Sequence, residues 1–356
     1  MPNTIVYLLY GSRREYHLEL TYSVLSVAHF LRRDPADIDI ALITTKEGRR
    51  DDLPVRHIFV DDDELRGWML GGAYNHAAKY GALVRAMDEF QGRVILVDTD
   101  TYLTQHPRVL FDRIGTDRSL MCDNDALIGD IEDWAPLLAK TGQPVAGYPI
   151  NAQSRMFNSG VVGVDWSLRS RLSDVYELMS ELYSIAPIFN VEQFAFSTVL
   201  DAHTSLSVCP DAVRHYWGFD RRFVHAQIDE LFPTFSREAF ERHVGTLRHL
   251  GIPRKPLLDR IRAKAVRLLR GGTPLYGFAY LSYLCALSSS DDKIAEAWAS
   301  TSLDALALEG KDRSRRNPRH LQRDFHKFYS ERLETQRWMR LETRQRWQKY
   351  WNELTQ

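Results

Sequence analysis

Short apolar runs alternate with amphipathic segments along the first part of the chain. Runs rich in apolar residues predict strands at 5–10, 38–44 and 55–60. Apolar residues at helical spacing predict helices from about 19 to 32 and from 75 to 90. Strands that alternate with helices predict a Rossmann-like α/β fold, whose mostly parallel central sheet binds ligands at the carboxyl ends of its strands.

The pattern changes beyond residue 225. Before it, the sequence predicts further strands that end at 125, span 160–165 and span 206–210. After it, the chain is predominantly helical, and polar residues studded with aromatic ones predict one long helix over 320–354. We therefore expect an α/β domain over 1–225 and a helical C-terminal region over 226–356.

Composition is that of an ordinary globular protein. The 356 residues are 44% hydrophobic and 26% charged, which allows a sizeable core. Three widely spaced cysteines without a Cys-x-x-Cys pair argue against a disulfide framework or a zinc site and favour a reducing compartment. The first residues predict a strand rather than a secretion signal, and the apolar segment 273–287 is too short to span a bilayer. We expect a cytoplasmic protein.

Charge is unevenly distributed along the chain. Residues 251–356 hold 21 Lys and Arg against 12 Asp and Glu, whereas the preceding 250 residues hold 25 against 35. The basic excess includes an amphipathic stretch at 256–270 and six cations over 311–323. Two interpretations stay open: peripheral contact with the anionic inner face of a membrane, or a solvated helix face that packs on the acidic body. No recognition motif accompanies the charge, so we expect no nucleic-acid binding.

The strongest chemical signal is a pair of carboxylates after an apolar run. Asp98 and Asp100 directly follow Val-Ile-Leu-Val, and strand alternation sends both side chains to the same side. Three other Asp-x-Asp pairs occur, at 37/39, 61/63 and 123/125, but only this one follows an uninterrupted apolar strand. Hard oxygen ligands at an open strand end favour Mg²⁺ or Mn²⁺.

Four motifs in this order resemble those of one enzyme family. They are Val-Ile-Leu-Val-Asp-Thr-Asp-Thr-Tyr-Leu around Asp98, Phe-Asn-Ser-Gly-Val-Val at 157–162, Glu192-Gln193, and His215-x-x-Gly218-x-x-Arg221. The series is similar to that of the retaining family 8 glycosyltransferases, of the glycogenin and lipooligosaccharide galactosyltransferase type, which have the A-type glycosyltransferase fold. The likeness covers about residues 1–225. It departs at Arg221, where the family has Lys, and at Glu192, where the family more often has Asp.

The resemblance implies a metal-dependent hexosyltransferase that uses a nucleotide-sugar donor, most simply a UDP-sugar, in cell-surface glycan or glycolipid synthesis. Residues 1–225 would bind the donor, and 226–356 would contact an acceptor, a membrane surface or a partner. The acceptor would be a glycan, glycolipid or protein, and the sugar would be transferred with retention. The implied roles are Mn²⁺ or Mg²⁺ binding by Asp98, Asp100 and His215, donor binding by Lys79, Asp98, Asp125, Asn158 and Arg221, and catalysis by Glu192 and Gln193.

Several of the implied roles have a structural alternative. Lys79 lies on an otherwise apolar helix face and could instead form an internal ion pair. Asn190-x-x-Gln193 also fits a capping box, in which Gln193 turns back to the helix start. Asp125 could be an ordinary loop acid, Asn158 a turn residue, and His215 a structural histidine beside aromatic residues.

Two other functions remain open. A sugar-nucleotide nucleotidyltransferase has a related fold but should carry a glycine-rich loop after its first strand, where residues 11–14 hold a single glycine. The other is a non-catalytic nucleotide-sugar-binding scaffold, which would have no need to keep Asp98, Asp100, His215 and Arg221 together.

Overall fold

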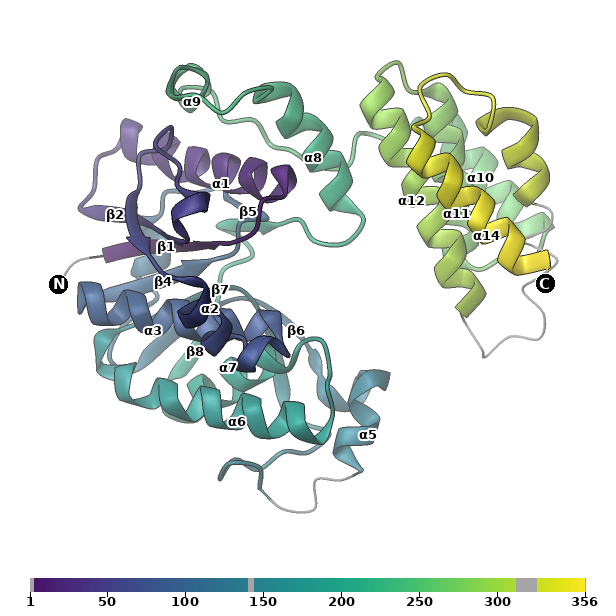
Figure 1. Ribbon diagram of the computed structural model, residues 1–356. Coiled ribbons are helices and arrows are strands. Elements are labelled where there is room, and N and C mark those ends of the chain that lie inside the picture. The colour runs from purple at the N-terminus through teal and green to yellow at the C-terminus, as the bar shows by residue number, and fades with distance from the viewer. Residues whose placement is uncertain (1–2, 140–143, 312–324, 356) are drawn as a thin grey trace. The chain divides into compact units, whose positions relative to one another are not determined.

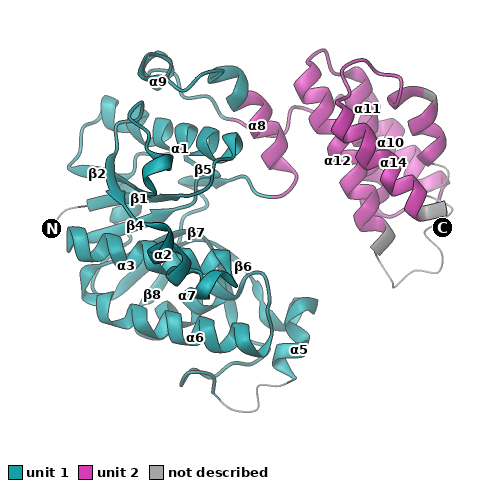
Figure 2. Cartoon of the chain, in the orientation of Figure 1, with its two compact units in different colours: residues 1–217, 228–249 teal, residues 218–227, 250–356 magenta. Residues whose placement is uncertain are grey.

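A computed structural model describes residues 3–139, 144–311 and 325–355 (Figure 1). The chain divides into two compact units (Figure 2). The first comprises Met1–Trp217 and Ile228–His249, and the second comprises Gly218–Gln227 and Leu250–Gln356. The predicted class, a mixed α/β fold with a mostly parallel sheet and a helical C-terminal region, is confirmed.

A seven-stranded sheet forms the centre of the first unit, in the order β3-β2-β1-β4-β7-β6-β8. Strand β7 pairs antiparallel with both of its neighbours, and the other pairs are parallel, so six strands run in one direction. The strands are β1 (Asn3–Leu9), β2 (Ile38–Thr44), β3 (Arg56–Phe59), β4 (Arg93–Val97), β6 (Arg118–Leu127), β7 (Arg155–Val164) and β8 (Ser205–Val208).

Helices cover the sheet and bury its apolar side chains. The expected inward face of α3, with Ala82, Leu83, Ala86 and Phe90, is buried, and this helix packs against β4. Helix α7 packs against β7. The helices of the first unit are α1 (Arg14–Arg33), α2 (Asp62–Trp68), α3 (Ala78–Phe90), α4 (Arg108–Phe111), α5 (Ala135–Leu138), α6 (Leu172–Ile185), α7 (Val191–His203) and α9 (Arg237–Val244). Helix α8 (Asp220–Leu231) belongs to the second unit up to Gln227 and to the first unit from Ile228. Short 3₁₀ helices lie at Lys46–Gly48, Leu70–Gly72, Asn75–Ala77, Ile128–Asp130, Glu132–Trp134 and Trp166–Arg171.

A second, two-stranded sheet lies beyond the carboxyl end of β4. Strand β5 (Thr101–Leu103) follows Asp100 after a tight turn and pairs antiparallel with β9 (Val213–His215). The register sets Thr101 opposite His215. Two segments more than a hundred residues apart in sequence are thereby fixed side by side.

The second unit is helical, with α10 (Leu257–Leu269), α11 (Pro274–Ser288), α12 (Asp292–Lys311) and α14 (Leu341–Thr355). The apolar segment that begins at Thr273 forms α11, and Thr273 caps this helix by accepting a hydrogen bond from the Tyr276 amide. Aromatic side chains fill the core of the second unit, and the rings of Tyr329 and Trp347 stack at a centroid distance of 4.6 Å. In the described part of the chain, no helix is both long and apolar enough to cross a membrane.

The prediction of one helix over 320–354 is wrong. Residues 320–324 lie outside the described residues, and beyond them the chain forms a helical segment that ends in a π-helix at Tyr329–Leu333. Turns over 334–340 separate it from α14. Met339 is buried at this reversal, and Trp347 then packs back on Tyr329, so packing of the aromatic core outweighs continuation of the helix.

Removal of one buried aromatic ring should strongly destabilise the first unit. Phe194 of α7 is fully buried, with its ring 4.7 Å from that of Trp134, centroid to centroid. We expect Phe194→Ala to lower the free energy of unfolding by about 3–5 kcal/mol, because it leaves a cavity. Phe189→Ala is the control, since Phe189 is 75% exposed. Urea unfolding of both variants measures the difference, and equal stabilities would contradict the expectation.

Candidate functional site

Asp98 and Asp100 lie in the short connection between β4 and β5. The backbone of this connection is held on both sides: the Asp98 amide donates to Gly160 O at 2.9 Å, and the Tyr216 amide donates to Asp100 O at 3.1 Å. The Thr101 hydroxyl also donates to Asp98 O at 2.8 Å. The two carboxylates are therefore fixed relative to β7 and β9.

His215 completes a group of three metal-ligand side chains. Its Nε2 lies 3.2 Å from Asp100 Oδ1. One candidate ligand atom each from Asp98, Asp100 and His215 lies within 4.8 Å of the other two, and all three residues are partly buried. Among the residues that the structure describes, this is the one group of three or more His, Cys, Asp or Glu side chains with such spacing.

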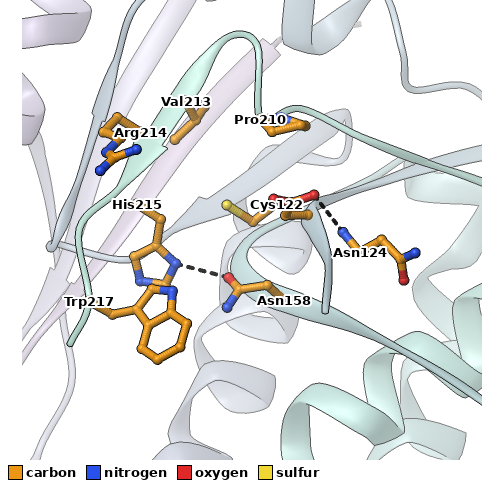
Figure 3. Close-up of a pocket in the computed structure, with 9 residues that line it drawn as sticks. Cys122, Asn124, Asn158, Pro210, Val213, Arg214, His215 and Trp217 are labelled. Atoms are coloured by element: carbon orange, nitrogen blue, oxygen red, sulfur yellow. Dashed lines mark hydrogen bonds between the residues drawn. The ribbon is translucent and has the colours of Figure 1, made fainter. Parts of the chain in front are cut away.

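The donor set fits a divalent cation. His215 Nδ1 lies 2.9 Å from Asn158 Oδ1 (Figure 3). Because a side-chain carbonyl only accepts hydrogen bonds, this contact places a proton on Nδ1 and directs Nε2 toward Asp100. A histidine whose second nitrogen is held in this way is typical of metal ligands. Two carboxylates and one imidazole are ligands that Mn²⁺ accepts, and Mg²⁺ accepts the carboxylates.

Gly160 makes room for the imidazole. A Cβ at this position would lie 2.5 Å from His215 Nδ1 and 3.0 Å from Asn158 Oδ1. Asn158 Oδ1 also accepts a hydrogen bond from the Gly160 amide at 2.9 Å. Because Gly160 has no side chain, His215 can pack against β7.

Lys79 of α3 forms the internal ion pair that the sequence left open. Its Nζ lies 2.7 Å from Asp98 Oδ2, 3.1 Å from Ser159 Oγ and 3.6 Å from Glu192 Oε1. The ammonium therefore balances two carboxylates from different elements. Its predicted contact with a donor stays a prediction.

Burial and charge shift the pKa values of this cluster. Burial lowers the pKa of Lys79, but the carboxylates of Asp98 and Glu192 outweigh this effect and raise it above its usual value. Burial raises the pKa of Asp98 despite the opposing charge of Lys79. For His215, burial lowers the pKa, but the hydrogen bonds to Asp100 and Cys122 raise it to about 10. The imidazole is therefore protonated at neutral pH when no cation is bound.

Glu192 and Gln193 begin α7 and face Ser159. Glu192 is buried, and its oxygens accept hydrogen bonds from the hydroxyls of Tyr74 at 2.7 Å and Ser159 at 2.9 Å. Gln193 Oε1 accepts from the Ser159 amide at 3.3 Å. Asn190 makes no side-chain capping bond, because its Oδ1 accepts from Trp134 Nε1 at 3.1 Å.

Ser159 and Tyr74 hydrogen-bond to the predicted site residues, and the sequence interpretation did not single them out. Ser159 joins Lys79, Glu192 and Gln193, and Tyr74 holds the far side of Glu192. Ser159 could have been found, because it stands between Asn158 and Gly160 in a motif already singled out. Tyr74 follows Gly71 and Gly72 and has no local sign of its role.

A pocket opens beside His215 (Figure 3). Trp217, which is 62% exposed, and Asn158 contribute to its walls. Its lining residues are Cys122, Asp123, Asn124, Asn158, Pro210, Val213, Arg214, His215 and Trp217.

All the predicted donor-binding roles stay predictions, including those of Asp125 and Arg221. Asp125 belongs to β6, but its side chain lies outside the described part of the structure. Arg221 lies near the start of α8, in the second compact unit.

Solved structures of glycosyltransferases resemble this chain at low sequence identity. No family model and no curated protein matches it. A structure of the galactosyltransferase LgtC in complex with donor and acceptor sugar analogs is similar over 73% of this chain and 99% of that one, with 16% identity and a TM-score of 0.46. An active-site mutant of LgtC is similar over 69% and 96%, with 16% identity and a TM-score of 0.43. Apo mouse xyloside xylosyltransferase 1 is similar over 58% and 85%, with 14% identity and a TM-score of 0.39.

The contact between Gly160 and His215 leads to a prediction on cation binding. We expect Gly160→Ala to displace the imidazole and to weaken Mn²⁺ binding about tenfold or more, as loss of a ligand's supporting contacts does. Gly67→Ala in α2 is the control, because a Cβ there meets nothing within 4 Å. Titration with Mn²⁺, followed by electron paramagnetic resonance of the free ion, measures the affinity. Equal affinities of both variants, with folding verified by circular dichroism, would contradict this role of Gly160.

Proposed function

We propose that the first unit is a metal-dependent glycosyltransferase, which moves a sugar from a nucleotide diphosphate to an acceptor. The observation that carries the proposal is the convergence of Asp98, Asp100 and His215 at the carboxyl end of a central strand. Open sheets of this class bind their ligands at that edge. The motifs in which these residues stand resemble those of family 8 glycosyltransferases.

The chemistry explains why a cation site belongs there. When the bond between the sugar C1 and the diphosphate breaks, negative charge accumulates on the phosphate oxygens, and a divalent cation would stabilise that charge. In the proposal, Asp98, Asp100 and His215 hold Mn²⁺ or Mg²⁺. Asn158 keeps the imidazole oriented, and Lys79 fixes one oxygen of Asp98.

The donor would occupy the space next to this group. The pocket beside His215 provides an open face that Asn158 also lines. We propose UDP as the nucleotide, with Lys79, Asp98, Asp125, Asn158 and Arg221 as donor-binding residues. These assignments rest on the resemblance.

Glu192 and Gln193 are the proposed catalytic residues. They start α7, so the positive end of the helix dipole lies beside them. Ser159 connects both to the backbone that carries Asn158 and Gly160. Transfer with retention is part of the proposal, through either a covalent intermediate or attack on the same face. The acceptor is a glycan, glycolipid or protein, and the enzyme acts in the cytoplasm or on the inner face of the membrane.

Nucleotide binding tests the metal site directly. We expect isothermal titration with UDP to give binding that requires Mn²⁺ or Mg²⁺, and we expect Asp100→Ala to abolish it, because one of three ligands is lost. Asp39→Ala is the matched control, since Asp39 belongs to another Asp-x-Asp pair and is exposed on β2. UDP binding that is independent of the cation, or unchanged in Asp100→Ala, would contradict the proposal.

Turnover tests the reaction. We expect hydrolysis of at least one nucleotide sugar in a panel of donors, dependent on the cation and lost in Asp100→Ala. Release of pyrophosphate from a nucleoside triphosphate would instead identify a nucleotidyltransferase. Metal-dependent UDP binding without hydrolysis of any donor would indicate a binding scaffold.

The charge of Glu192 leads to a separate prediction. We expect Glu192→Gln to lower donor hydrolysis about 100-fold, as loss of a charged group that acts on the reacting centre does. Its affinity for UDP with the cation should change little, because Asp98, Asp100 and His215 remain. Glu296→Gln in α12, a buried glutamate of the second unit, is the control. Unchanged hydrolysis in Glu192→Gln would assign this residue a purely structural role.

A further inference from the structure

Helix α10 of the second unit exposes most of its large apolar side chains. Ten large hydrophobic residues are exposed in the described part of the chain, and five of them belong to this one helix. They are Leu257, Leu258, Ile261, Leu268 and Leu269, each at least 56% exposed. Isolated exposed leucines are normal, but five on thirteen residues form a surface.

The exposed residues share one face of the helix. At about 100° per residue, the five side chains fall within roughly a third of the circumference. Asp259 and Ala263, which are buried, lie on the opposite side and face α11. Asp259 Oδ2 accepts a hydrogen bond from Ser288 Oγ at 3.2 Å, which fixes this orientation. The helix thus packs through its small and polar residues and presents its apolar face outward.

Cations flank this apolar face. Arg260, Lys264 and Arg267 follow one edge, and Arg262 lies at the other, 3.6 Å from Asp259. No described carboxylate forms an ion pair with any of the first three. Over residues 254–270 the sequence has seven Lys and Arg and a single acid. The charge beside the apolar face is therefore positive, and among the described residues Arg260, Lys264 and Arg267 have no carboxylate partner.

The same three cations line a shallow pocket between α10 and α11. Its other residues are Ala263, Pro274, Gly277, Phe278 and Leu281. A Cβ at Gly277 would lie 2.8 Å from Arg267 Cδ, so the aliphatic part of the Arg267 side chain packs against the backbone of Gly277. Polar anions that bind here would meet several cations at once, directly beside the apolar face.

We propose that α10 docks this protein on an anionic lipid bilayer. The leucines and Ile261 enter the boundary between headgroups and acyl chains, while the long stems of Arg260, Lys264 and Arg267 carry their charges to the lipid phosphates. A second copy of this chain fits less well, because a symmetric contact through this face would bring the same cations together. The proposal concerns the second unit only and does not depend on glycosyl transfer.

Vesicle flotation of the full chain tests the docking. We expect binding to mixed phosphatidylcholine–phosphatidylglycerol vesicles, no binding to phosphatidylcholine alone, and weaker binding as salt rises. Leu258→Glu/Leu269→Glu should weaken binding at least about tenfold. Lys264→Glu should weaken it about fivefold or more. The controls are Leu341→Glu and Lys349→Glu, exposed residues of α14 in the same unit.

A fluorescent label reports insertion at a single position. All three native cysteines are buried, so a cysteine introduced by Leu258→Cys can be labelled alone with an environment-sensitive dye. We expect a blue shift of its emission when anionic vesicles are added and no shift for Leu341→Cys. Circular dichroism of each variant verifies folding.

Three outcomes would overturn the proposal. The first is no binding to anionic vesicles at low salt, and the second is equal weakening by the α10 variants and their controls. The third is a dimer of the unaltered chain that Leu258→Glu/Leu269→Glu dissociates, which would assign the face to a second copy. Loss of UDP binding in any of these variants would concern the first unit, so failure of this proposal and failure of the proposed function are distinguishable.

Discussion

The candidate site depends on the pairing of β5 with β9. This short ladder sets His215 opposite Thr101, one residue after Asp100, and so joins a histidine from late in the first unit to carboxylates at the end of β4. Strand β7 provides the third side, because its Asn158 holds the imidazole and its Gly160 leaves the space for it. If the ladder shifted by one residue, the side chain of His215 would point to the other face and the group would not form.

Charge balance explains how five ionisable side chains can lie together in the partly buried candidate site. Three carboxylates, from Asp98, Asp100 and Glu192, face one lysine and one imidazole. With the imidazole protonated, as its raised pKa implies, and with all three carboxylates ionised, the cluster has a formal charge of −1. Lys79 contacts Asp98 and Glu192, whereas Asp100 pairs with His215, and His215 lines the neighbouring pocket. Buried charges need such compensation, because an unpaired one is costly.

Local sequence patterns predicted the strand that carries the site residues. The contacts between distant elements depend on tertiary packing, which local patterns do not show. The apolar run before Asp98 predicted a buried strand end, and β4 ends there. The link through Ser159 and Tyr74 depends on contacts of β7 and of the segment before α3 with α7, which no spacing along the chain displays. The failed prediction of one helix over 320–354 has the same cause. Residues 334–340 contain no Gly or Pro, and the reversal there is imposed by the aromatic core that Met339 and Trp347 join.

Within the second unit, helix α10 packs in an unusual way. If its apolar residues packed the helix on the other helices of this unit, they would be its buried face. Instead Asp259 and Ala263 are buried, and Leu257, Leu268 and Leu269 are each more than 60% exposed. Each large apolar side chain left in water forgoes about 1.5–3 kcal/mol of burial energy. This exposed apolar surface is flanked by Arg260, Lys264 and Arg267, none of which pairs with a described carboxylate. It therefore has the two properties that binding to an anionic bilayer requires.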